Sequence, residues 1–121
     1  MRRPTRPALR WWLFGLALVV QLVVLYAPVA PSEGGGYGVD KLVHAATFAA
    51  VVWTGRRAGV RWGWVMALSA VHGPLSEWLQ AHFLPHRDGS VWDALADLVG
   101  VAVAAAVPVR RSTADRERMA S

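Results

Sequence analysis

The sequence predicts an all-α, polytopic membrane protein with four transmembrane helices in a small bundle. The chain has 121 residues, of which 55% are hydrophobic and 17% are charged. A soluble domain of this size encloses too little volume to bury so much apolar surface, whereas a bilayer supplies a second apolar medium. The chain has no cysteine, so its composition excludes disulfides, thiol catalysis and thiolate metal sites.

The placement of the basic residues indicates the topology. Eleven of the thirteen lie in three short groups, within 2–10, 56–61 and 110–118. Such groups mark the cytoplasmic side of a membrane, and three groups on one side require an even number of spans. We therefore expect a multi-pass protein of the cell membrane with both termini cytoplasmic. Its parts are a basic tail at 1–10, a membrane domain at 11–109 and a second basic tail at 110–121.

The first predicted span, 11–30, contains Gln21 as its one strongly polar side chain. At about 1.5 Å per residue this segment reaches about 30 Å, the thickness of the hydrocarbon core. A cleaved signal peptide is the less favoured alternative, because further apolar segments follow. The segment 31–38 is rich in glycine and is predicted to form an external loop.

The second span is expected to begin near Val39 or Asp40 and to end before Arg56. Its uncharged part, 42–55, would reach only about 21 Å, so the charged residues before it should belong to its first turn. The segment 56–61, with three arginines, is then a tight internal loop.

The third and fourth spans complete the bundle. The third is expected from 62 to about 79, with a kink at Gly73–Pro74, because proline removes a helical hydrogen bond. An outer loop at 81–90 leads to the fourth span, 91–109. Tryptophan and tyrosine residues fall near the predicted span ends, as aromatic belts do at membrane interfaces.

Ionisable side chains gather in the predicted outer halves of the spans. They come from three spans and one loop: Asp40, Lys41, His44, Glu77, Arg87, Asp88, Asp93 and Asp97. A charge within a span costs a few kcal/mol, so these side chains should face the bundle interior and one another. Spacings of three and four residues place each set on one helix face: Asp40 with His44, Glu77 with Gln80, and Asp93 with Asp97 and Gly100. Gly100 and Ala104 continue that last face as a small-residue pair that lets another helix approach.

An ordered set of residues carries a family resemblance: Asp40-Lys41-x-x-His44, Ser76-Glu77-x-x-Gln80, then Arg87, Asp93, Asp97 and Gly100. This pattern, over roughly residues 39–104, resembles that of the VanZ-like family of small membrane proteins. The resemblance implies a helical membrane domain and, through the founding member of the family, a link to resistance against the glycopeptide antibiotic teicoplanin. Asp97 stands where the family pattern usually has asparagine, and Ala104 where it has glycine.

The candidate binding site is the set of polar residues at the outer side, here called the outer polar cluster: Asp40, Lys41, His44, Glu77, Gln80, Arg87, Asp93 and Asp97. Pairs such as Glu77 with Arg87, or Lys41 with Asp93, can equally be structural ion pairs that hold the helices together. The remaining histidines have no metal-ligand spacing with His44, so we expect no metal and no other cofactor.

The charge balance of the cluster is unfavourable. Four carboxylates, those of Asp40, Glu77, Asp93 and Asp97, stand against Lys41 and Arg87. Either one carboxyl is protonated, with the deeper Asp97 as the candidate, or a cation or an amine-bearing ligand occupies the pocket.

Two functions are favoured. The first is the binding or modification of a cell-envelope component, a lipid-linked or glycopeptide ligand, from the outer side, with an effect on glycopeptide susceptibility. The alternative is a membrane enzyme in which Lys41 and Arg87 clamp the phosphate of a lipid-linked substrate and Glu77, Asp93 or His44 does acid–base work. A proton-coupled exporter is disfavoured, because the inner halves of the spans carry no carboxylate. A purely structural role is a further alternative, and the sequence does not determine whether the protein catalyses a reaction or which oligomeric state it has. No module of alternating aromatic and basic residues is present, so we expect no binding of nucleic acid.

Overall fold

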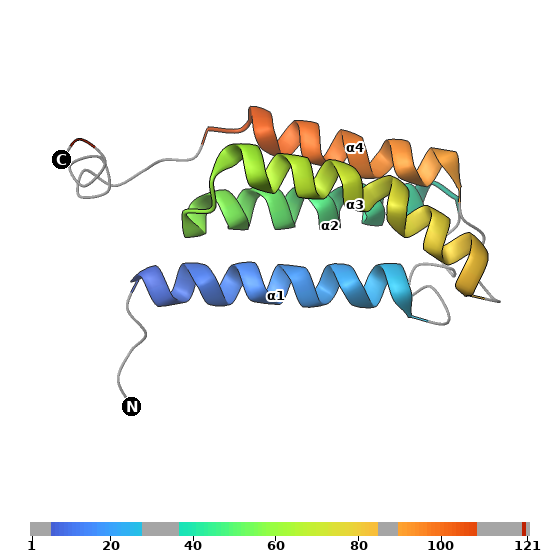
Figure 1. Ribbon diagram of the computed structural model, residues 1–121, viewed down its shortest axis with the longest axis horizontal. Coiled ribbons are helices and arrows are strands. Elements are labelled where there is room, and N and C mark those ends of the chain that lie inside the picture. Colours follow the sequence, from blue (N-terminus) through green and yellow to red (C-terminus); the bar gives the residue numbers. More distant parts are fainter. Residues whose placement is uncertain (1–5, 28–36, 85–89, 109–119, 121) are drawn as a thin grey trace.

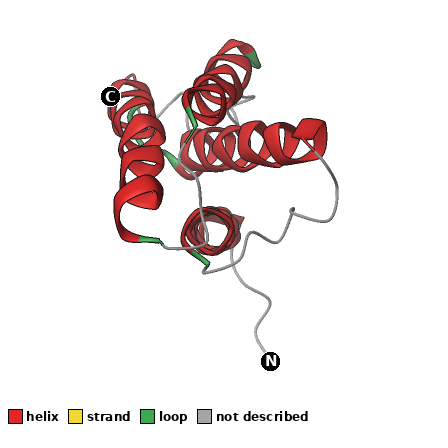
Figure 2. Ribbon diagram, turned by 90° about the vertical axis from the view of Figure 1, so that its right-hand side faces the viewer, coloured by secondary structure: helices red, strands yellow, loops and turns green. Residues whose placement is uncertain are grey.

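The computed structural model describes residues 6–27, 37–84, 90–108 and 120. In these residues the regular elements are four helices, in the order α1, Arg6–Tyr26; α2, Tyr37–Ala58; α3, Trp62–Phe83; and α4, Val91–Ala106. Figure 1 shows α1, α2 and α4 running along the long axis of the molecule, and Figure 2 shows the helices from one end, with no strand in the described part. The predicted all-α, four-helix class is confirmed for these residues.

Helices α1 and α2 differ in their ends from the expected spans. Helix α1 begins at Arg6, inside the expected tail, and ends at Tyr26 rather than at 30; residues 28–30 lie outside the described part. Proline at 28 disfavours helix at the residue before it, which accounts for this end. Helix α2 begins at Tyr37, inside the expected external loop 31–38, whose first six residues lie outside the described part. It continues to Ala58, so the expected internal loop 56–61 shortens to 59–61. Gly59, with φ of 105°, ends it in the left-handed conformation that glycine tolerates.

Helices α3 and α4 differ in a similar way. Helix α3 continues to Phe83, so the expected outer loop 81–90 begins only at Leu84, and α4 ends at Ala106 rather than at 109. Helix α3 is continuous through Gly73–Pro74. Figure 1 shows its second half turning away from the line of the first, which confirms the expected change of direction without a break.

The packing is centred on α2, which contacts the other three helices and packs most extensively against α4. Gly100 of α4 lies against the backbone of α2, and a Cβ atom added there would lie 2.1 Å from the carbonyl oxygen of Ala45. Ala104 is buried one turn later. The expected small-residue face on α4 is therefore confirmed, and it brings two helix backbones into direct contact.

The distribution of polar and apolar side chains differs from that in a soluble helical bundle. In the described part of the chain, nine polar or charged side chains are buried, against eight hydrophobic ones. Large hydrophobic side chains are instead exposed on all four helices, for example Leu16, Leu42, Leu68 and Val99. A soluble protein rarely exposes continuous apolar surface of this extent.

Helix α1 is the one helix in the described part that is long and apolar enough to cross a membrane by length and composition. Only 17% of its most apolar window is buried inside the bundle, so it is not a core helix of the kind that passes the same criterion in soluble proteins. Signal sequences near an N-terminus pass the same criterion.

Arg56 of α2 reaches the C-terminal end of α4. Its Nη1 atom donates hydrogen bonds to the carbonyl oxygens of Ala104, Ala105 and Val107, at 2.9, 3.2 and 2.9 Å. The first two carbonyls lie in the last turn of α4 and the third belongs to its C-cap residue. At this end the helix itself supplies no donor and its dipole favours a positive charge. Arg56 therefore caps α4 from another helix.

We expect Arg56→Gln to lower the free energy of unfolding by about 1.5 kcal/mol, the low end for hydrogen bonds from a charged group. The matched control is Arg57→Gln, because the Arg57 guanidinium only lies over the Trp53 ring, 4.6 Å from its centre. That contact is exposed and should be worth about 0.5 kcal/mol. Thermal unfolding of the purified variants in detergent measures both. Equal stabilities of the two variants would show that Arg56 does not cap α4.

Candidate functional site

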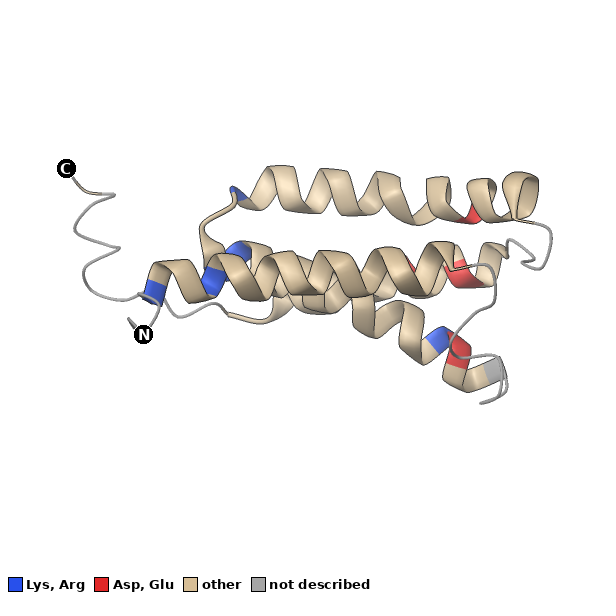
Figure 3. Ribbon diagram, turned by 90° about the horizontal axis from the view of Figure 1, so that it is seen from below, with Lys and Arg blue, Asp and Glu red and all other residues tan. Residues whose placement is uncertain are grey.

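The outer polar cluster lies where three helices meet at one end of the bundle. Figure 3 shows the acidic residues of the described part at that end and, apart from Lys41, the basic ones at the other. Helix α2 supplies its members from the first two turns, α3 from its second half and α4 from its first two turns. The structure describes seven of the eight predicted site residues; Arg87 lies outside the described residues.

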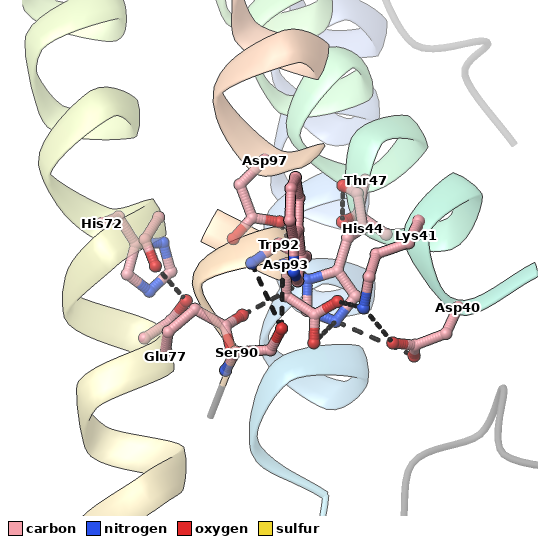
Figure 4. Close-up of polar contacts among 12 residues, drawn as sticks. Asp40, Lys41, His44, Thr47, His72, Glu77, Ser90, Trp92, Asp93 and Asp97 are labelled. Carbon is pink, nitrogen blue, oxygen red and sulfur yellow. Dashed lines mark hydrogen bonds and ion pairs between the residues drawn. The ribbon is translucent and has the colours of Figure 1, made fainter. Parts of the chain in front are cut away.

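The deepest part of the cluster is a triad of His44, Glu77 and Asp97, one residue from each of three helices. The His44 Nδ1 atom lies 2.9 Å from Asp97 Oδ1 and 3.5 Å from Glu77 Oε1. All three residues are buried, with exposed fractions of 1%, 6% and 0% in sequence order. Figure 4 shows His44 between the carboxylates. Histidine and aspartate therefore share a hydrogen bond in the interior, with a second carboxylate beside them.

The outer edge of the cluster is an ion-pair network around Lys41. The Lys41 ammonium contacts the carboxylate of Asp93 directly and lies 3.7 Å from Asp40 Oδ2. The other ring nitrogen of His44, Nε2, lies 4.0 Å from Asp40 Oδ1 and 4.0 Å from Asp93 Oδ2. Asp40 and Lys41 are partly exposed, so the cluster is open to its surroundings at this edge.

Glu77 also joins α3 to the start of α4. Its Oε2 atom accepts a hydrogen bond of 2.9 Å from the backbone N–H of Ser90, and the Ser90 hydroxyl accepts from the backbone N–H groups of Trp92 and Asp93. A carboxylate at this point is favourable, because the N-terminal end of a helix carries partial positive charge. The second oxygen of Glu77, Oε1, is left to face His44.

The backbone of α3 is shaped to admit Asp97. Gly73 is buried opposite it, and a Cβ atom added to Gly73 would lie 3.2 Å from the Asp97 Cβ. The Ser76 hydroxyl donates to the Gly73 carbonyl at 2.7 Å, which occupies one acceptor near the proline. The small residue before Pro74 therefore has a steric role that the sequence analysis, which considered only a kink, did not assign.

Several buried polar groups have no hydrogen-bond partner. They are Asp97 Oδ2, Glu77 Oε1, Gln80 Nε2 and, on α1, Gln21 Nε2. Gln80 is buried as expected from its place in the site pattern. A buried polar atom without a partner costs about 1–3 kcal/mol, so three such atoms in the outer polar cluster call for an explanation.

Sequence reasoning missed the polar contacts between α1 and α3. The Tyr26 hydroxyl lies 2.8 Å from His72 Nε2 and joins the two helices by a hydrogen bond. Gln21, buried one turn earlier on α1, was the only strongly polar residue in its predicted span. That exception was the signal available for a buried polar face on α1.

No protein-family model, no curated protein and no solved structure matches this chain. The similarity to the VanZ-like pattern therefore rests on the residues described above.

Proposed function

We propose that the chain is a four-span membrane protein, with both termini cytoplasmic, that binds a positively charged cell-envelope component at its outer polar cluster. The observation that carries the membrane assignment is that about half of the buried side chains in the described part are polar, while large apolar side chains are exposed on every helix. Lipid accepts such a surface, and helices in lipid associate through buried polar and small residues.

Exposed tryptophans support the same orientation. Trp12, Trp62 and Trp64 are exposed at the arginine-rich end of the bundle, and Trp78 and Trp92 are exposed near the acidic end. Two such belts belong at the two interfaces of a bilayer, and arginine marks the cytoplasmic one. The outer polar cluster then faces the cell envelope.

The charge of the cluster favours a cationic ligand. Within the described residues it holds four carboxylates and one lysine, and that lysine is already paired with Asp93 and near Asp40. An amine entering at the partly exposed edge would meet net negative charge. The ligands that fit bear an amine and are either a lipid-linked component of the cell envelope or a glycopeptide antibiotic, in line with the VanZ-like resemblance.

A change in teicoplanin susceptibility tests this proposal. A glycopeptide-sensitive bacterial host that produces the protein should differ in its inhibitory concentration from the same host without it. Asp40→Asn should abolish this difference at unchanged membrane abundance, because it removes negative charge from the accessible edge. Asp115→Asn, an acid of the C-terminal tail, is the control and should behave as wild type. An unchanged inhibitory concentration with the wild-type protein would refute the glycopeptide ligand.

One observation favours the alternative, an enzyme of lipid-linked substrates. An apolar cavity of about 380 Å³ lies between α1, α2 and α3, lined by residues that include Phe14, Leu18, Leu68 and His72, and it could hold an acyl chain. Lipid extracts of cells with and without the protein separate the two functions. A lipid-linked intermediate that changes with the wild-type protein and not with Glu77→Gln would favour the enzyme.

A further inference from the structure

We propose that His44, Glu77 and Asp97 form a binding site for one divalent transition-metal ion, of which zinc fits best. The proposal concerns the purified chain itself and does not rest on the membrane topology or on the envelope ligand. One ligand atom from each of the three residues lies within 4.8 Å of those of the other two. The His44 ligand would be Nδ1, which faces Glu77 Oε1 and Asp97 Oδ1.

The spacing of these atoms suits a small metal ion. Ligands bound to zinc at about 2.0–2.2 Å with tetrahedral angles lie about 3.4 Å apart. The distance from His44 Nδ1 to Glu77 Oε1 is 3.5 Å, and the distance to Asp97 Oδ1 is 2.9 Å. The second distance must lengthen by roughly half an ångström to reach that spacing. One imidazole and two carboxylates are a donor set for zinc, whereas calcium and magnesium take oxygen alone.

The unpartnered atoms supply a second, independent observation. Glu77 Oε1, the oxygen that faces His44, accepts no hydrogen bond, and water cannot supply one because Glu77 is only 6% exposed. Asp97 Oδ2 also has none in a residue that is fully buried. A cation bound by the two carboxylates would stabilise both groups, which otherwise bear the cost of burial without a partner.

The surroundings of His44 fit the orientation of a metal ligand. A histidine that binds a metal through one nitrogen usually directs the N–H of the other toward a carboxylate. Here the His44 Nδ1 atom faces the carboxylates of Glu77 and Asp97, and Nε2 lies 4.0 Å from carboxylate oxygens of both Asp40 and Asp93. With every carboxyl ionised, the two positive charges of the ion would also reduce the excess of four carboxylates over Lys41 from three to one, which leaves the cluster negative. The expectation that no metal is bound rested on histidine spacing, and spacing along the chain does not reveal carboxylates from other helices.

Zinc binding by the full-length chain tests the proposal. The protein is purified in detergent with an affinity tag that contains no histidine, treated with a chelator, and dialysed against zinc chloride. We expect one ion per chain by atomic absorption, and an increase in the unfolding temperature with zinc concentration. Asp97→Asn, which keeps the size and the hydrogen-bonding oxygen, should weaken binding by about 100-fold or more, since even outer contacts of a metal site are worth 10- to 100-fold.

His82→Gln is the matched control. His82 is exposed on α3 and its Nδ1 atom lies 2.8 Å from the carbonyl oxygen of Trp78, so this variant should bind zinc as wild type does. Failure of the wild-type chain to bind one equivalent would overturn the proposal, and the triad would then be a charged hydrogen-bond network. Binding that survives Asp97→Asn but is lost in Asp40→Asn would also overturn it, because the ion would then lie at the outer edge. Neither failure would alter the teicoplanin result, so the two proposals fail separately.

Discussion

Replacement of the exposed Val99 by aspartate is expected to prevent stable membrane insertion of the chain. Val99 lies at the middle of α4 and is 57% exposed. A soluble bundle tolerates a charge at such a position within about 0.5 kcal/mol. At the centre of a bilayer the same charge costs about 3 kcal/mol. The amount of protein in the membrane fraction, measured by immunoblot, should therefore decrease severely.

The control for this experiment is a valine-to-aspartate substitution at the first residue of the same helix. Val91 is 77% exposed but is the first residue of α4, at the expected interface, where water reaches the side chain and the helix dipole favours a negative charge. Val91→Asp should insert normally. Equal abundance of the two variants would argue that the exposed faces do not contact lipid.

Replacement of Gly100 by alanine is expected to separate α2 from α4. The added methyl group would lie 2.1 Å from a backbone oxygen of Ala45, which has no rotamer by which to move away. Overpacking of this kind costs about 3 kcal/mol, whereas the better helix propensity of alanine returns only about 1 kcal/mol. Thermal unfolding in detergent should show a net loss of about 2 kcal/mol.

Gly15→Ala on α1 provides the comparison. Nothing lies within 4 Å of a Cβ atom added there, so only the propensity gain applies and the variant should be as stable as wild type or slightly more stable. If Gly100→Ala is as stable as Gly15→Ala, the backbones of α2 and α4 do not lie as close together as the structure shows.

The existence of the four helices could be predicted from the sequence, because each contains an apolar run with glycine, proline or arginine near its ends. Their ends could not be predicted to the residue. Helix α2 continues past Arg56 and Arg57 and ends at Gly59, which has φ of 105°. The three arginines indicated a loop from Arg56 onward, although arginine is compatible with helix and the glycine marks the end.

The composition of the outer polar cluster could be predicted, because charges in apolar segments must face one another. The pairing within it was predicted only in part. The Lys41–Asp93 pair was one of the expected alternatives, whereas the position of His44 between Glu77 and Asp97 depends on how three helices rotate about their axes. Spacing along one helix defines a face and does not determine which residue of another helix lies opposite.

Thiol labelling of single-cysteine variants in intact cells tests the central claim most directly, since the chain has no cysteine of its own. The positions are Ser32, Arg61, His86 and Ser112, one in each predicted loop and one in the C-terminal tail. We expect an impermeant maleimide to label Ser32→Cys and His86→Cys, and to label Arg61→Cys and Ser112→Cys only after the cells are opened. The reverse pattern, or labelling of all four variants in intact cells, would contradict four spans with an outward-facing cluster.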